Sequence, residues 1–348
     1  MPWTKVYANK AEFEKISAEQ KGLRGLTYRE AILEATEQAL TADKNVFVIG
    51  EGIDDPGGVF GTTKDLHLKF GADRVMDSPL AENGITGITV GAAVAGARPL
   101  LVHMRVDFLP LSLDQIINHA AKWHYMFGGA VRVPLTIRAI IGRGWGSAAQ
   151  HSQSLQAMLL NIPGLKVVMP ATPYDAKGLL YAAIFDNNPV IMIEHRWLYE
   201  HMGHVPAEPY KVEIGKGIVR RQGKDATIVA ISLMVNEAIK AADELSKDGI
   251  EAEVIDIRSL KPLDSDLVIE SVKKTGRLIV ADTGWKDCGI GAEIITRVVE
   301  DAFESLRAPA VRVALPEAPT PASPALENAY YRGKNDIIAA VKKTLARS

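Results

Sequence analysis

The chain has 348 residues, of which 47% are hydrophobic and 24% are charged, as in an ordinary globular protein. This composition excludes a disordered tail, a collagen-like fibre and a disulfide scaffold, and the length predicts about two domains. The 42 acidic and 40 basic residues give a formal net charge of -2, so charge alone predicts no nucleic-acid partner and no membrane-surface partner. Cys288 is the single cysteine and no apolar stretch is long enough to span a membrane, so we expect a cytoplasmic protein.

In the first half of the chain, helical patterns alternate with short apolar runs. Residues 27–43 carry apolar side chains at helical spacing, and Thr27 with Glu30 forms a candidate capping box at their start. Continuous runs of Val, Ile and Leu are typical of strands covered on both faces, and their alternation with helices predicts a parallel sheet. The expected strands are 45–52, 99–104, 133–140, 165–172 and 189–195, and the other expected helices are 83–96, 114–126 and 175–185.

The second half repeats this alternation after a stretch rich in proline and glycine. The expected strands there are 227–232, 252–260, 277–284 and 310–315, and the expected helices are 235–246, 266–274, 291–306 and 336–345. Four prolines between Pro316 and Pro324 predict an extended surface segment. We therefore predict an α/β protein with two parallel-sheet domains: an N-terminal arm (1–25), a first domain (26–205), a linker (206–223) and a second domain (224–348).

Three loops carry residues that suggest chemistry, and ligands of open parallel sheets bind beyond the carboxyl ends of the strands. Glu82 precedes a glycine-rich helix, where a helix-start carboxylate stabilised by the helix dipole is the plain alternative. His151 follows a glycine-rich turn and is either a proton carrier near a helix N-terminus or a hydrogen-bonded structural histidine. Phe108 follows an expected strand and either grips a flat ring or packs in the core. The sequence lacks HExxH, CxxC and GxSxG, which disfavours a zincin, a zinc ribbon and an α/β-hydrolase.

Several segments in the same order resemble a known family, the β subunits of the E1 component of 2-oxo acid dehydrogenase complexes. This family covers the pyruvate, branched-chain and acetoin enzymes and belongs to the transketolase-like thiamine diphosphate proteins. The similarity runs from about Leu26 to Leu345 and implies a pyrimidine-binding domain followed by a transketolase C-terminal domain. Its most specific segments are 50–66, 69–99, 114–129, 150–154, 163–191 and 214–230.

The resemblance implies a role for five residues. Glu82 matches the glutamate that hydrogen-bonds the aminopyrimidine ring of thiamine diphosphate, and Phe108 matches the aromatic residue that stacks on this ring. Leu80 and Met104 match positions in the pocket wall. His151 matches the histidine that stabilises intermediates and assists acyl transfer to a lipoyl group. A buried carboxylate beside an apolar ring hydrogen-bonds strongly, because water does not compete there.

The resemblance also implies partners and ions. The GDG motif through which thiamine enzymes bind Mg²⁺ and the diphosphate is absent here, and in this family it lies on a separate α subunit. The expected functional unit is thus an α2β2 heterotetramer with an E1 α subunit, acting on a small 2-oxo acid and docking a lipoyl-bearing E2. A monovalent-cation site, possible for K⁺, aligns with Leu135, Ala183, Ile184, Asp186 and Asn188.

The sequence differs from the family pattern in two places, and two alternative functions are considered. Val102 and Met104 stand where the family usually has Glu and Gln, and the tail lacks the usual Gly-Asp pair before its prolines. Arg105 either pairs with an acidic substrate or is a solvated surface arginine. The alternative functions are the C-terminal half of a split transketolase and a non-catalytic regulatory paralogue; Glu82, Phe108 and His151 together argue against the latter.

Overall fold

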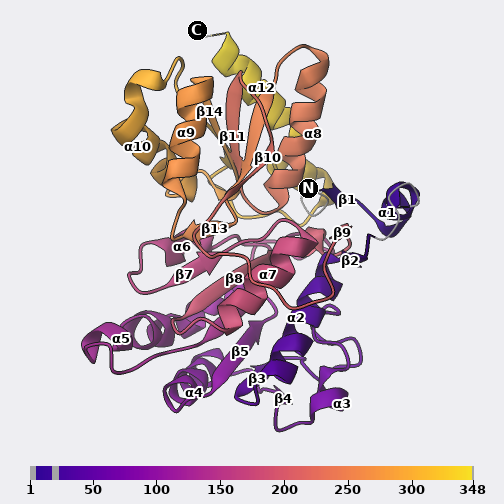
Figure 1. Cartoon of the computed structure of the whole chain (residues 1–348), viewed down its shortest axis with the longest axis vertical. Coiled ribbons are helices and arrows are strands. Elements are labelled where there is room, and N and C mark those ends of the chain that lie inside the picture. Colours follow the sequence, from indigo (N-terminus) through magenta and orange to yellow (C-terminus); the bar gives the residue numbers. More distant parts are fainter. Residues whose placement is uncertain (1–4, 18–22, 347–348) are drawn as a thin grey trace. The chain divides into compact units, whose positions relative to one another are not determined.

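The computed structural model describes residues 5–17 and 23–346, so residues 1–4 and 18–22 of the expected N-terminal arm lie outside the described residues. The chain forms two compact units, coloured along the sequence in Figure 1. Unit 1 consists of Met1–Gly142 and Met158–Ile214, and unit 2 of Arg143–Ala157 and Gly215–Ser348. Within the described ranges, none of the helices has the length and apolar character needed to cross a membrane.

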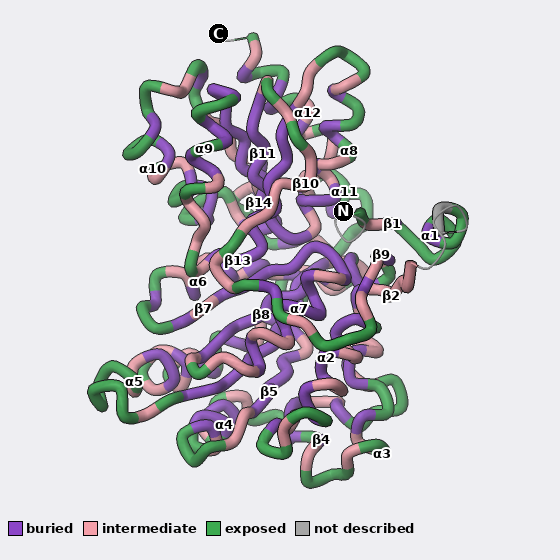
Figure 2. The backbone as a smooth tube through the Cα atoms, viewed as in Figure 1, coloured by how far each residue is buried: buried purple, intermediate pink, exposed green. Residues whose placement is uncertain are grey.

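A parallel sheet forms the centre of unit 1, as the apolar runs predict. Its strands lie in the order β7-β8-β6-β5-β3-β4, and every neighbouring pair among them is parallel. Strand β8 is buried along its whole length (Figure 2), because both faces of the sheet are covered. The strands are β3 (Val46–Gly50), β4 (Val75–Asp77), β5 (Arg98–His103), β6 (Thr136–Ile141), β7 (Lys166–Val168) and β8 (Val190–His195).

Three expected helices of this half begin within two residues of their predicted starts, at Tyr28, Glu82 and Pro173, whereas the helices α1, α3 and α6 were not predicted. Thr27 and Glu30 form the expected capping box at the start of α2, with the Thr27 amide donating to the Glu30 carboxylate at 2.8 Å. Helix α7 begins with Pro173 after the N-cap Thr172, and α2 packs against α7. A small antiparallel sheet has the order β1-β9-β2. These elements are α1 (Lys10–Ser17), α2 (Tyr28–Ala42), α3 (Leu66–Phe70), α4 (Glu82–Val94), α6 (Gln156–Leu160), α7 (Pro173–Ile184), β1 (Val6–Tyr7), β2 (Gly25–Thr27), β9 (Met202–His204) and the 3₁₀ turn η4 (Arg196–Leu198).

The prediction of one amphipathic helix over 114–126 is wrong. The segment divides into a π-helical stretch, η3 (Gln115–Ala120), and a short helix, α5 (Trp123–Met126). The break falls where another loop meets the backbone: a Cβ on Gly164 would lie 1.9 Å from the Ala121 carbonyl oxygen. The Lys122 ammonium also donates to the Pro163 carbonyl at 2.7 Å. This tertiary contact explains a break that helical periodicity alone does not show.

Unit 2 contains a five-stranded sheet in the order β10-β12-β11-β14-β15. The pairs are parallel except β10-β12, so β10 is an antiparallel edge strand. Helices α9 and α10 pack together, as do α8 and α12, and the two pairs lie on opposite sides of the sheet in Figure 1. The elements are β10 (Ile218–Arg221), β11 (Ala226–Ala230), α8 (Leu233–Lys247), β12 (Ala252–Asp256), β13 (Ser259–Lys261), α9 (Ser265–Thr275), β14 (Leu278–Trp285), α10 (Ile290–Ala302), η5 (Phe303–Ser305), β15 (Val311–Leu315), α11 (Pro324–Tyr330) and α12 (Lys334–Leu345).

Helix α11 was not predicted from the sequence. The residues from Pro316 to Ser323 form neither helix nor strand, as the prolines predict, but Pro324 then begins a helix of seven residues. A proline at the first helical position fits the helix, because that amide has no intrahelical partner in any case. The last proline of the run is therefore a helix start and not part of an extended segment.

Candidate functional site

The candidate site of unit 1 lies at the carboxyl edge of its parallel sheet. Strands β3 and β4 run parallel and end at Gly50 and Asp77. The Ser78 amide donates to the Gly50 carbonyl at 3.1 Å, and the Ile53 amide donates to the Asp77 carboxylate at 3.2 Å. These bonds hold the loops after the two strands against each other. The edge is the position at which parallel α/β sheets bind ligands.

Glu82 is the first residue of α4 and is half-buried. Among the described residues, no hydrogen bond or ion pair engages its carboxylate. Its backbone carbonyl is satisfied, because it accepts from the Thr86 hydroxyl at 2.7 Å and from the Ser112 hydroxyl at 3.0 Å. The side chain therefore remains available to a ligand, and it also lies where a helix dipole stabilises a negative charge.

Glu51 lies beside Glu82 and was not singled out from the sequence. Burial raises the pKa of the Glu51 carboxyl, and the negative charges of Glu82 and Asp77 raise it further. Three carboxyl groups thus share this edge of the sheet. The available signal was the sequence Gly50-Glu51-Gly52 directly after a buried strand, which places a polar side chain between two glycines at a strand end.

The other predicted pocket residues follow β5 or precede α4. Met104 comes directly after β5, and a Cβ on Gly52 would lie 3.5 Å from its terminal methyl carbon. Phe108 lies in the 3₁₀ segment η2 (Val106–Ser112), which packs against α4 and is bonded to it through Ser112. Leu80 is 82% exposed. Met104 therefore lies beside the loop that follows β3, and Phe108 lies in a segment that contacts α4, the helix that begins with Glu82. Leu80 is exposed at the surface of the chain.

Arg105 is buried, so the interpretation as a solvated surface arginine is wrong. Its guanidinium donates to the Gly142 carbonyl at 2.8 Å, within unit 1. His103, two residues earlier, is also buried, and burial lowers the pKa of its imidazole to about 4. Its Nε2 atom is buried with no hydrogen-bond partner among the described residues. His103 is thus neutral at physiological pH, because nothing nearby compensates for the loss of water around its charged form.

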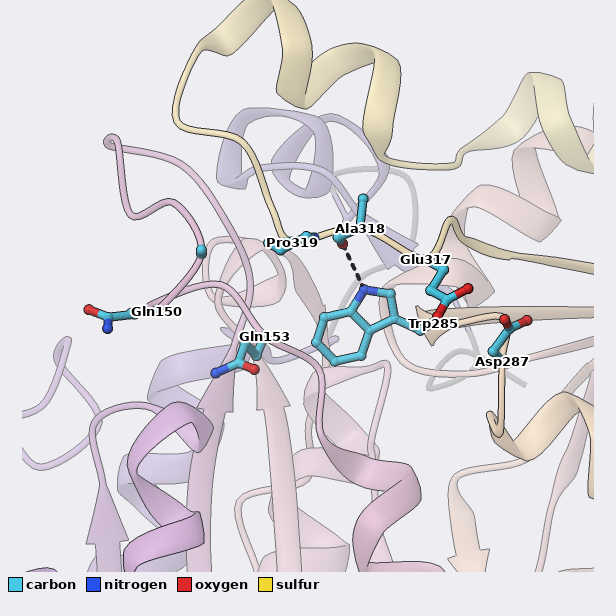
Figure 3. A pocket seen from close by; sticks show the side chains of 8 residues that line it. Gln150, Gln153, Trp285, Asp287, Glu317, Ala318 and Pro319 are labelled. Carbon is cyan, nitrogen blue, oxygen red and sulfur yellow. Dashed lines mark hydrogen bonds between the residues drawn. The ribbon is translucent and has the colours of Figure 1, made fainter.

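His151 belongs to unit 2 and is exposed in the loop that follows Gly142. It does not stand at a helix N-terminus as expected, because α6 begins five residues later at Gln156. The residues on either side of it, Gln150 and Gln153, line a cavity of about 560 Å³ within unit 2 (Figure 3). The remaining lining residues are Ala149, Trp285, Asp287, Glu317, Ala318 and Pro319.

The residues of the predicted monovalent-cation site lie in unit 1, in a neighbourhood that already contains two side-chain cations. Arg98 donates to the carbonyls of Ile184 and Asp186, at 3.3 Å and 3.0 Å. Lys166 bonds the Asp186 carboxylate at 2.5 Å, and Asn188 donates to the same group. A monovalent cation would have to bind beside both, so the site stays a prediction. The carbonyls of its two other members already accept backbone hydrogen bonds, that of Leu135 from the Val190 amide and that of Ala183 from the Asp186 amide.

Comparisons with known proteins agree along nearly the whole chain. Residues 24–202 match the transketolase pyrimidine-binding domain, and residues 215–337 match the transketolase C-terminal domain. The β subunit of acetoin:2,6-dichlorophenolindophenol oxidoreductase from Cupriavidus necator is 46% identical over 332 residues, covering 92% of this chain and 98% of the relative. The chain belongs to the E1 β-subunit family of transketolase-like enzymes. The pyruvate dehydrogenase E1 β subunit of Bacillus subtilis is 43% identical, with 92% of this chain and 98% of the relative covered.

A solved structure with a transketolase-like fold is similar to this chain. It is a split-gene transketolase described as an inactive β4 tetramer, with a TM-score of 0.74 and 26% identity, and 93% of this chain and 99% of that chain are covered. The two-domain transketolase-like architecture expected from the sequence is thus confirmed. Glu82, half-buried and without a side-chain partner in residues 5–17 and 23–346, lies within the part of the chain that matches the pyrimidine-binding domain, and a free carboxylate has the chemistry to accept a hydrogen bond from a ring nitrogen.

Proposed function

We propose that the chain is the β subunit of a thiamine diphosphate-dependent 2-oxo acid dehydrogenase, which decarboxylates a 2-oxo acid and transfers the acyl group to a lipoyl group of an E2 protein. In this reaction the carboxyl group leaves as CO₂ and the acyl carbon bonds to one lipoyl sulfur. The S–S bond breaks and the other sulfur takes up a proton, so the disulfide is reduced while the acyl carbon is oxidised. The single observation that carries the proposal is the Glu82 carboxylate at the carboxyl edge of the sheet, which has no hydrogen-bond or ion-pair partner in the described part of the chain.

Glu82 would hold a proton at the ring nitrogen of the aminopyrimidine. Bound thiamine diphosphate supplies the electron sink for decarboxylation. The carboxylate is half-buried, and the charge of nearby Glu51 adds to the negative potential around it, so a hydrogen bond from a protonated ring nitrogen is favoured. Phe108 would stack on the ring, and Leu80 and Met104 would line its pocket.

His151 would move the proton that the lipoyl sulfur takes up. Its exposure suits this role, because the lipoyl group arrives from another protein and must reach the histidine from solvent. The two ring nitrogens of an imidazole can accept and donate a proton, which makes the side chain suitable for moving protons. Gln150 and Gln153 on either side carry amides, which do not take up or release protons, so His151 is the proton-transferring side chain of this segment.

An α subunit would complete the site. No group of three or more His, Cys, Asp or Glu residues in 5–17 and 23–346 is arranged to hold a metal ion, and the sequence has no GDG motif for Mg²⁺ and the diphosphate. Unit 1 also exposes large apolar side chains, as a surface that binds another protein does. These are Leu80, Ile88, Leu111, Tyr125, Met126 and Phe127. The proposed assembly is an α2β2 heterotetramer that also docks E2, located in the cytoplasm; the single cysteine agrees with a reducing compartment.

The substitution Glu82→Gln tests the proposal in the enzyme assembled with its α subunit. We expect turnover of 2-oxo acids to fall by about 10²–10³-fold, because an amide replaces the negative charge that stabilises the protonated ring. Glu30→Gln is the matched control: it makes the same change in the first turn of α2, in the same unit. Turnover of the Glu82→Gln enzyme at the parental rate would contradict the proposal.

A split transketolase is the second candidate, favoured by the TM-score of 0.74 to such a protein. The relatives named as dehydrogenase or acetoin oxidoreductase subunits are more similar in sequence, at 42–46% identity against 26%. Assays of the assembled enzyme with 2-oxo acids and with sugar phosphates separate the two functions. We expect turnover of a 2-oxo acid only, and ketol transfer between sugar phosphates would favour the second candidate.

A further inference from the structure

The loop that carries His151 is held by the C-terminal part of the chain. Residues 143–157 follow strand β6 of unit 1 in sequence, yet their contacts place them in unit 2 with residues 215–348. The loop contains no helix or strand before Gln156. Its conformation therefore depends on the side chains that contact it.

The loop contains two residues whose backbone conformation is unfavourable unless contacts with other residues stabilise it. Trp145 and Ala148 have φ values of 56° and 52°, in the left-handed region that residues with a Cβ rarely adopt. Such residues cost on the order of 1 kcal/mol each and persist only where the surroundings hold them. Trp145 is exposed, so burial of its side chain in a core does not supply that support.

One anchor lies at Tyr331, directly after α11. The Arg143 guanidinium lies 4.3 Å from the centre of the Tyr331 ring and donates to the Asn328 side chain at 3.4 Å. The Tyr331 hydroxyl donates to the Ser152 carbonyl at 3.4 Å. Ser152 is the residue next to His151, so this anchor fixes the backbone on both sides of the loop's glycine-rich stretch.

The other anchor lies at Asp282 in β14. Its carboxylate accepts from the Gln156 side chain at 2.9 Å and from the Gly284 amide at 3.1 Å. Asp282 and Gln156 are 3% and 1% exposed, so water does not compete for this bond. A Cβ on Gly284 would lie 2.7 Å from the Gln156 amide nitrogen, so only glycine leaves room for the contact. Burial raises the pKa of Asp282, and the bonds to Gly284 and Gln156 lower it in part.

Between the anchors, Gln150 and His151 are exposed, whereas Ser152 and Ser154 are buried. Gln150 and Gln153 line the cavity of about 560 Å³ together with Trp285, whose indole N–H donates to the Ala318 carbonyl (Figure 3). The same indole N–H also donates to the Tyr330 hydroxyl. The contacts of Tyr331 with Ser152 and of Asp282 with Gln156 hold the loop within a few residues of His151.

We propose that Asp282 and Tyr331 are positioning residues, through which the C-terminal domain holds the loop and sets the position of His151 for acyl transfer. The proposal rests on the proposed function for the role of His151. The holding of the loop is a property of this chain alone. The two parts can therefore be measured separately.

Hydrogen exchange of the full chain tests the holding of the loop. We expect Asp282→Ala to speed exchange of amides in residues 143–157 by about 10-fold or more, and Tyr331→Phe to speed it a few-fold, because anchors limit local opening. Asp282→Asn keeps an acceptor oxygen for Gln156 and should restore slow exchange. Tyr330→Phe is the matched control, because the Tyr330 hydroxyl bonds Trp285 and Ala318 and not the loop. Slow exchange in strand β11 identifies variants that remain folded.

Kinetics of the enzyme assembled with the α subunit test the consequence. Acyl transfer to a lipoyl acceptor is compared with decarboxylation coupled to the dye 2,6-dichlorophenolindophenol, which needs no lipoyl group. We expect Asp282→Ala and His151→Ala to lower kcat for acyl transfer by about 10-fold or more with little change in KM, and to lower dye reduction by a smaller factor. Asp282→Asn and Tyr330→Phe should stay near the parental rate.

Two results would overturn the proposal. One is parental exchange of residues 143–157 in folded Asp282→Ala and Tyr331→Phe chains. The other is faster exchange with undiminished acyl transfer, in an enzyme that His151→Ala does impair. If His151→Ala leaves acyl transfer intact, the proposed role of His151 fails, and the exchange data alone decide whether the C-terminal domain holds the loop.

Discussion

Two glutamates of unit 1 are held in opposite ways. Glu194 in β8 is fully buried; it is paired with Arg138 and accepts from the Tyr199 hydroxyl at 2.7 Å. Glu82 is half-buried at the sheet edge, and its carboxylate has no partner among the described residues. A buried charge whose bonds are all made within the protein stabilises or specifies the fold. A carboxylate left without partners at a ligand-binding edge is available for chemistry instead.

The largest effect is expected from breaking the buried ion pair between Glu194 and Arg138. In Glu194→Gln, Arg138 keeps its charge inside the sheet without a counter-charge, because both residues are fully buried. We expect a loss of about 3–5 kcal/mol in the free energy of unfolding, measured by urea denaturation. A loss below about 1 kcal/mol would mean that the pair does not serve the fold as described.

His103 is a third case, a buried ionisable side chain that stays neutral because burial disfavours its charged form. Its folded-state pKa of about 4 lies below the ordinary value of 6.5, so the unfolded chain binds the proton first as pH falls. Stability is therefore lost from about pH 6.5 down to about pH 4, by up to about 3 kcal/mol. The variant His103→Phe should lose less stability over this range in unfolding experiments at several pH values. Parallel curves for the two chains would contradict the burial of His103.

Glu82→Gln should leave stability almost unchanged. No described side chain loses a bond, so we expect a change below about 1 kcal/mol in urea unfolding, in contrast to Glu194→Gln. The substitution also removes the repulsion between the charges of Glu82 and Glu51, which favours the folded chain. A destabilisation as large as that of Glu194→Gln would make Glu82 a structural residue.

The smallest effect is expected at an exposed ion pair of the same unit. Glu200 pairs with Arg29 at 2.9 Å, but both side chains are largely exposed, at 62% and 40%. Glu200→Gln should change the free energy of unfolding by less than about 0.5 kcal/mol, because water screens the pair. A larger loss would show that the contribution of an ion pair to the free energy of unfolding does not depend on its burial in this unit.

The sequence predicted those features that depend on neighbouring residues. The capping box of Thr27 and Glu30 and the buried strand β8 follow from local chemistry and from apolar runs. The break of the 114–126 helix could not be predicted, because it results from the approach of Gly164, more than forty residues away. The burial of Arg105 likewise depends on the carbonyl of Gly142.

The candidate site shows the same division. Glu82 could be predicted, because a carboxylate before a glycine-rich helix is visible in the sequence and the family resemblance assigns it a role. Its neighbour Glu51 was missed, since nothing local shows that β3 and β4 bring the two carboxyls together. The anchoring of the His151 loop by Tyr331 depends on residues 179 positions apart, which no periodicity in the sequence indicates.

Reconstitution with an α subunit tests the central claim, that this chain supplies only part of a thiamine site. Thiamine diphosphate binding is measured by calorimetry, with Mg²⁺ present, for the chain alone, the α subunit alone and their mixture. We expect stoichiometric binding of thiamine diphosphate and decarboxylation of a 2-oxo acid in the mixture, and no decarboxylation by the chain alone. Decarboxylation by the isolated chain at the rate of the mixture would contradict it.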